Sequence, residues 1–198
     1  MNSLEICIME YPDREDFDIS KGENPALLQI SLEFDSALDL IVNGQHVLSS
    51  KKEDHYKYPL FEFLSSFANG IRELLESGQA IIRIYLQQYS FSATSPCHTL
   101  LPRRENHNLW QCRVDFHWYS ELAKPADLPS VHNELIEIED LITAYNLSAI
   151  QFEQTTKAAI LPLFPNVAAK LNEIFTRLPN VIRAWDDYQS RFRSQERD

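Results

Sequence analysis

One short segment of the chain carries the residue types that move protons. Arg113, Asp115, His117 and Tyr119 alternate along the sequence, so on a β-strand their side chains share one face. An aspartate beside a histidine can orient the imidazole as a general base. No G-x-S-x-G or H-E-x-x-H motif ties a nucleophile or a metal to this row. We therefore favour a solvated outer strand face, with a small hydrolase or transferase using Asp115 and His117 as the alternative.

A second group of polar residues offers anion chemistry. Arg103 and Arg104 are adjacent, and His107 follows in the same predicted turn. Two guanidinium groups side by side can grip a carboxylate or a phosphate. In the enzyme alternative, these arginines or Arg113 would hold an anionic substrate. The negative charge of the whole chain opposes a free anion, so we expect a solvated turn.

Cysteines and histidines form a third group, because thiolates and imidazoles are the ligands that zinc prefers. The spacing is unfavourable: no close pair such as C-x2-C occurs, and five residues separate Cys112 from His117, which places them on opposite faces of a strand. The four glycines form neither a phosphate-binding loop nor a dinucleotide-binding motif. We therefore expect no metal and no cofactor. The residues considered for the metal are Cys97, His98, His107, Cys112 and His117.

An acidic segment near the N-terminus is the strongest candidate for binding. It places five carboxylates and two aromatic rings in nine residues, without the pattern of an EF-hand. Carboxylates steer association with a basic surface, and the aromatic rings supply apolar anchors. A solvated connector whose Phe17 enters the core is the plainer interpretation. The predicted partner-binding residues are Glu10, Tyr11, Asp13, Glu15, Asp16, Phe17 and Asp18.

Charge restricts the class of partner. The 198 residues include 18 lysines and arginines and 29 aspartates and glutamates, a net charge of −11. Residues 1–36 hold nine acidic and two basic side chains, which gives −7 in that segment. Such a chain repels nucleic acid and attracts a basic protein. No apolar run of about 18 residues and no signal peptide is apparent, and three cysteines without a C-x2-C pair favour the cytoplasm.

The elements that must position these residues begin with strands. Asn43-Gly44 predicts a two-residue type I′ hairpin turn, because both positions need positive φ. In that register Val47 is expected opposite Leu40. Alternating apolar residues predict strands over Leu4–Ile8, Leu28–Phe34 and Leu38–Val42.

The middle of the chain changes from strand to helix and back. Apolar residues at three- and four-residue steps predict an amphipathic helix over Pro59–Ser77, with Gly78 as its C-terminal cap. Gly70 within this helix indicates close packing. Strand periodicity returns from Ala80, and a change of parity predicts a bulge near Gln87 and Gln88.

A second hairpin is expected around Arg103–Asn108. Its returning strand has apolar residues at even positions from Trp110 to Trp118. We expect Leu101 opposite Trp110 and Thr99 opposite Cys112, a register that places the apolar side chains of both strands on one face.

After Pro129 the pattern becomes helical. Apolar residues from Leu135 to Tyr145 predict a helix that Ser130 caps. Four carboxylates would then form its solvated face: Glu134, Glu137, Glu139 and Asp140.

Further helices are predicted towards the C-terminus. Ser148 to Gln151 matches a capping box and would open a helix that ends near Pro162, with an extended conformation of residues 147–155 as the alternative. Pro165 and Pro179 each suit a helix start. The last helix would carry the apolar residues Val181, Ile182, Trp185, Tyr188 and Phe192.

This order of elements predicts an α+β fold: a mostly antiparallel sheet with one inserted amphipathic helix, followed by a helical C-terminal third. Residues 1–128 would form the sheet domain, and residues 129–198 a helical region packed on it as one unit. The favoured function is a non-catalytic acidic binding module, such as an immunity or antitoxin-type protein that occludes a basic nuclease toxin. A structural adaptor that dimerises through Trp185, Tyr188 and Phe192 is the third interpretation.

Overall fold

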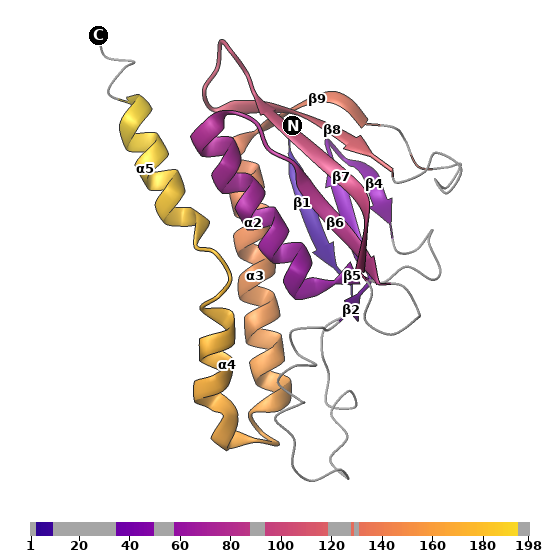
Figure 1. Cartoon of the computed structure of the whole chain (residues 1–198), viewed down its shortest axis with the longest axis vertical. Coiled ribbons are helices and arrows are strands. Elements are labelled where there is room, and N and C mark those ends of the chain that lie inside the picture. The colour runs from indigo at the N-terminus through magenta and orange to yellow at the C-terminus, as the bar shows by residue number, and fades with distance from the viewer. Residues whose placement is uncertain are drawn as a thin grey trace.

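The architecture comes from a computed structural model that describes residues 3–9, 35–49, 58–87, 94–118, 128 and 131–193. The acidic segment Glu10–Asp18 and the strand predicted at Leu28–Phe34 lie outside these residues. Within them, antiparallel sheets and α-helices confirm the predicted α+β class with a helical C-terminal part (Figure 1). The strands belong to more than one sheet, whereas the prediction had a single sheet.

The first sheet has the strand order β1-β3-β4, with the bounds β1 (Leu4–Ile8), β3 (Leu38–Val42) and β4 (Gln45–Ser49). Asn43 and Gly44 have φ of 50° and 78°, as the predicted turn requires. A register shift between Leu40 and Ile41 places Leu48 opposite Leu40. The prediction for Val47 is therefore wrong, because it assumed a ladder without a bulge. A two-stranded ribbon joins β2 (Asp35–Ser36) to β5 (Tyr58–Pro59).

Helix α2 (Leu60–Ser77) confirms the predicted amphipathic helix. Gly78 ends it in the left-handed conformation with φ of 86°, and its N–H donates to the Leu74 carbonyl at 2.9 Å. Gly70 lies directly against Ile82, because a Cβ on Gly70 would come within 2.2 Å of the Ile82 Cγ1. The close packing expected at this glycine is therefore a contact between α2 and the neighbouring strand β6.

The second sheet contains four antiparallel strands in chain order: β6 (Ile82–Gln87), β7 (Thr94–Arg104), β8 (Gln111–His117) and β9 (Val131–Glu137). The register of β6 against β7 shifts between Ile84 and Tyr85. The irregularity therefore lies before the predicted bulge at Gln87 and Gln88, and Gln88 itself is outside the described residues.

The register of β7 against β8 differs from the prediction. Leu101 lies opposite Asp115, and Thr99 lies opposite His117. The hairpin turns later than expected, so the pairing is displaced by an odd number of residues, which exchanges the two faces of β7. Leu100 is the β7 residue that pairs with Phe116 in the core.

Residues 131–145 form a strand and then a helix. Val131–Glu137 is strand β9, so the helix expected from Ser130 begins only at Ile138 as α3 (Ile138–Ile160). Strand β9 therefore belongs to the sheet, although the prediction placed these residues in the helical region 129–198. Ser148 lies buried in the middle of α3 and does not cap a second helix, and the extended alternative for residues 147–155 is wrong. The capping-box pattern fails because the tertiary contacts continue the helix through it.

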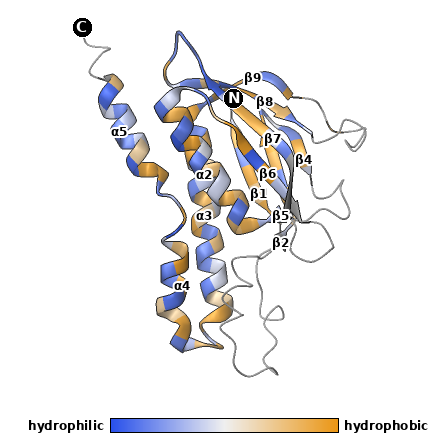
Figure 2. Cartoon of the chain, viewed as in Figure 1, coloured by the Kyte–Doolittle hydropathy of each residue, from blue (hydrophilic) through white to orange (hydrophobic). Residues whose placement is uncertain are grey.

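The C-terminal elements are the 3-10 turn η2 (Pro165–Val167) and the helices α4 (Ala168–Phe175) and α5 (Val181–Arg193). Pro165 opens the 3-10 turn that leads into α4, and α5 begins two residues after Pro179. Figure 1 shows α2 between α5 and the sheets, and α4 beside the far half of α3. In Figure 2 hydrophobic colours concentrate on the strands, which lie to the right of these helices. Ile182 is 43% exposed, unlike the other apolar residues of α5. Of the helices described, none combines the length and apolarity needed to cross a membrane.

Candidate functional site

The outer face of β8 carries the predicted proton-transfer row. Arg113, Asp115 and His117 alternate with the buried residues of this strand, as expected, while Tyr119 lies outside the described residues. The Asp115 carboxylate accepts a hydrogen bond from the Asn133 N–H at 2.9 Å and lies 3.8 Å from the His132 Nδ1. Its neighbours are thus residues of β9, and no contact between Asp115 and His117 is found in the described part of the chain.

Asn133 explains the arrangement of this row. Its φ is 59°, a left-handed conformation that few non-glycine residues adopt, and it lies where the β8–β9 register shifts. Arg113 donates a hydrogen bond from its Nη1 to the Asn133 carbonyl at 3.0 Å, while Asp115 accepts one from the Asn133 N–H. The two side chains therefore hold both polar groups of one irregular backbone position. The sequence does not identify His132 and Asn133 as neighbours of this row, because the helical pattern from Leu135 predicts a helix over this segment.

The histidines beside Asp115 are open to solvent. His132 has a 62% exposed side chain, and its ring centroid lies 5.9 Å from that of His117. Neither histidine lines either of the two hollows described for residues 72–113, 133 and 180–191. A general base in an enzyme works in a site that excludes water and aligns a nucleophile. The geometry thus fits a structural role better than acid–base catalysis. Arg113 and Asp115 together hold the backbone of Asn133 in β9, and we call this pair the clamp on Asn133.

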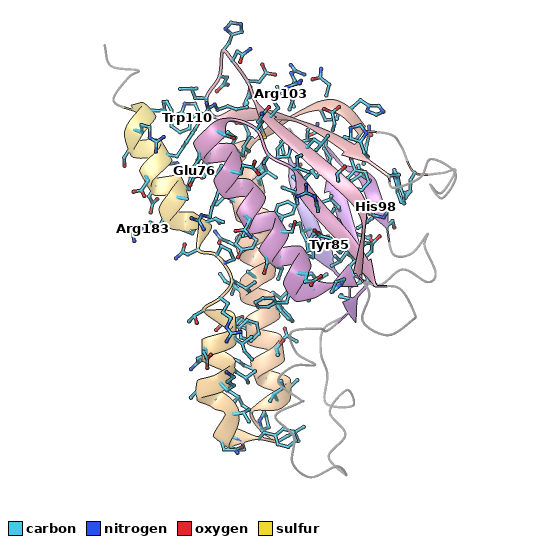
Figure 3. The ribbon with its side chains drawn as sticks, viewed as in Figure 1. Glu76, Tyr85, His98, Arg103, Trp110 and Arg183 are labelled. Atoms are coloured by element: carbon cyan, nitrogen blue, oxygen red, sulfur yellow. The ribbon has the colours of Figure 1, made fainter. Side chains whose placement is uncertain are left out.

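A polar hollow lies beside Arg113 and Asn133, at the turn that joins β7 and β8. It has a volume of about 550 Å³ and lies between the C-terminal end of α2 and the ends of β7 and β8. Figure 3 labels Arg103 at this end of the sheet, close to the C-terminal end of α2. We call it the arginine hollow, and its main lining residues are Gly78, Gln79, Arg103, Arg104, Glu105 and Arg113.

The three arginines of the hollow have different surroundings. Arg113 pairs with the Glu105 carboxylate. The Arg104 guanidinium lies 5.8 Å from the ring centroids of both Tyr188 and Phe192, within cation–π range. Arg103 is exposed and has no ion pair within the described part of the chain. The structure thus brings Arg113 to the two adjacent arginines, whereas His107 does not line the hollow.

Cys112 and the described histidines do not form a ligand cluster. Cys112 is buried on the inner face of β8 and His117 is exposed on the outer face, as their spacing predicts. Burial, and secondarily the Glu137 carboxylate, raises the pKa of the Cys112 thiol to about 12, which keeps it protonated and unreactive. His98 lies buried with its Nε2 3.3 Å from the Tyr58 hydroxyl. No group of three or more metal-ligating side chains is found among the described residues.

The four carboxylates expected on one helix are divided between two elements. Glu134 and Glu137 lie on β9, where they accept hydrogen bonds from Asn43 at 2.8 Å and Gln111 at 2.6 Å. Glu139 and Asp140 lie in the first turn of α3. Burial raises the pKa of Asp140, and the neighbouring Glu137 and Glu139 carboxylates raise it further. Negative charge is therefore concentrated where β9 ends and α3 begins.

The aromatic residues proposed for dimerisation are used within one chain. Trp185 and Tyr188 stack at a centroid distance of 5.6 Å, and both rings meet Trp110 edge-on. The Tyr188 hydroxyl donates to the Leu109 carbonyl at 2.6 Å. Trp185 is 7% exposed and Tyr188 1%. Dimerisation through these side chains stays a prediction. It would require α5 to detach from the rest of the same molecule.

Comparison of the chain with protein-family models, with curated proteins and with solved structures finds no match.

Proposed function

We propose that the protein is a non-catalytic binding module that docks on a basic protein partner and occludes the surface it covers. An immunity or antitoxin-type role against a basic nuclease is the concrete form of this proposal. The observation that carries it is the net charge of −11, of which −7 falls in residues 1–36. Charge of one sign concentrated in one segment accelerates association with a partner of the opposite sign.

The pairing of surface charges supports this proposal. Lys157 pairs with Glu153, and Lys170 and Arg177 share Glu173, so these three positive charges are neutralised locally. In contrast, Glu62, Glu139 and Asp186 form no ion pair with any described residue. The negative excess is thus left facing solvent, where it can act on a partner.

The clamp on Asn133 makes the enzyme alternative less favourable. Asp115 would have to orient His117, but its carboxylate is engaged with the Asn133 N–H and lies beside His132. The location proposed with this function is the cytoplasm, in keeping with the free thiols of Cys7 and Cys112.

The acidic segment is tested by removing its charge. The full chain is first used to recover its basic partner from a native lysate, and association rates are then measured by stopped flow. The variant Asp13→Asn/Glu15→Gln/Asp16→Asn should bind about tenfold more slowly at low salt, with a weaker dependence on ionic strength.

A matched control removes three exposed carboxylates from the helices. The variant Glu62→Gln/Glu73→Gln/Asp186→Asn has the same net charge as the first variant and should associate nearly as fast as the unmodified chain. Equal rates for both variants and the unmodified chain at low salt would refute steering by the acidic segment.

A further inference from the structure

We propose that the arginine hollow is a binding site for a small dianion, one that presents a phosphate group or a pair of carboxylates. The site is built from residues at the ends of α2, β7 and β8 and from Asn133 of β9, and the proposal does not depend on the proposed docking function. It offers positive charge in a chain whose overall charge is strongly negative.

The first observation is a pair of like charges placed face to face. Arg103 and Arg113 are direct partners across β7 and β8. Directly opposed side chains on antiparallel strands have Cβ atoms about 5 Å apart, and like charges at such positions destabilise the sheet. Glu105 offsets part of this repulsion by pairing with Arg113, and an anion bound at the Arg103 guanidinium would remove the rest.

The second observation is the charge of the lining. The charged residues around the hollow are three arginines and one glutamate, so its net charge is +2. Glu105 neutralises one guanidinium by pairing with Arg113. Arg103 has no such partner among the described residues, so its donors are available to a ligand. Arginine binds oxyanions through two parallel N–H donors, and a dianion matches the remaining charge.

The third observation is the construction of the walls. Gly78 closes one side, where an added Cβ would lie 3.1 Å from a terminal nitrogen of Arg104. The carbonyl of Gly78 accepts a hydrogen bond from the Arg104 N–H at 2.7 Å. This bond occupies an acceptor at the negative end of helix α2 that would otherwise face an anion. Gln79, Asn106 and Asn133 add neutral polar groups, and about 550 Å³ suits a small ligand.

The test measures phosphate binding to the full chain by titration calorimetry, with succinate as the dicarboxylate and chloride as the monoanion. We expect saturable binding of phosphate or succinate and none of chloride, and the tighter of the two identifies the ligand class. Arg103→Gln should weaken this binding about tenfold, the loss expected for one charge-assisted contact.

Two further variants separate the site from overall charge. Glu105→Gln releases Arg113 and should tighten binding several-fold, while Arg83→Gln removes one exposed arginine outside the hollow and should leave it unchanged. Circular dichroism checks that each variant is folded. The proposal is overturned if neither dianion saturates the chain, or if Arg103→Gln and Arg83→Gln have equal affinity. The acidic-segment variant should bind the dianion as the unmodified chain does, so the two proposals fail independently.

Discussion

Gly70 shows how one residue sets the distance between two elements. It lies in the middle of α2, where alanine would ordinarily favour the helix by about 1 kcal/mol. The place of a β-carbon is already occupied, because the Ile82 Cγ1 lies 2.2 Å from it. The side chain of Ile82 is fully buried and cannot move into solvent. Contact with β6 therefore outweighs helix propensity at this position.

Substitution of this glycine should destabilise the protein. We expect Gly70→Ala to lower the free energy of unfolding by about 1–2 kcal/mol, because overpacking exceeds the gain in helix propensity. Urea denaturation measures the change. The adjacent exposed residue is the control: Asn69→Ala should alter stability by less than about 0.5 kcal/mol. A Gly70→Ala variant more stable than the unmodified chain would contradict the close packing.

Asp115 and Arg113 show that the face of a polar residue is easier to predict than its hydrogen-bond partner. Their alternation on an exposed strand face was predicted, yet the sequence did not indicate their partner. Both side chains bind the backbone of Asn133, which is 18 residues from Asp115. Periodicity assigns a side chain to a face, but it carries no information on which neighbouring strand lies beside that face.

At the scale of elements, the β7–β8 hairpin shows why pairing is harder to predict than strand position. Both strands were expected, and the apolar face of β8 was assigned correctly from Cys112 to Phe116. The turn was placed too early. A pairing displaced by an odd number of residues reverses the faces of β7, so Leu100 and not Leu101 lies in the core.

A pair of engineered cysteines distinguishes the two registers. Thr99 lies opposite His117, so Thr99→Cys/His117→Cys should form a disulfide on mild oxidation, because opposed Cα atoms are about 5 Å apart. Peptide mapping by mass spectrometry identifies the bond.

The single variant Thr99→Cys is the control for this experiment. The predicted register would place this thiol opposite the native Cys112, whereas in the structure Arg104 occupies that position. A disulfide between residues 99 and 112 would show that the sequence-based register is the right one.

For the molecule as a whole, charge is the dominant property. A net charge of −11 creates repulsion within the folded state, and the ion pairs that would offset it are mostly exposed and short-range. Salt screens the long-range repulsion first, because the Debye length falls from about 30 Å at 0.01 M to about 8 Å at 0.15 M.

Stability should therefore increase with ionic strength over this range. Unfolding by urea, which is uncharged, should give a higher free energy of unfolding at about 0.15 M than at about 0.01 M sodium chloride. The variant Asp13→Asn/Glu15→Gln/Asp16→Asn has a net charge of −8 and should show a smaller increase. Stability that falls as salt is added would mean that surface ion pairs outweigh the repulsion.

The sequence predicted the residue types of the candidate sites better than their arrangement in space. The adjacency of Arg103 and Arg104 suggested anion binding, but the sequence favoured a solvated turn. Their position beside Arg113 and Gly78 depends on the register of β7 and on the end of α2, so it was not predictable from spacing. The acidic segment Glu10–Asp18 lies outside the described residues, and its role stays a prediction.

The sequence alone determined the local features: the α2 helix with its glycine cap, the Asn43-Gly44 turn and the α+β class. Each follows from interactions between residues close together in the chain, which periodicity and turn chemistry record. The tertiary structure decided the register of β7, the assignment of Val131–Glu137 as a strand and the continuity of α3 through Ser148. These depend on contacts between distant segments, and such contacts override local preference wherever a hydrophobic face must be buried.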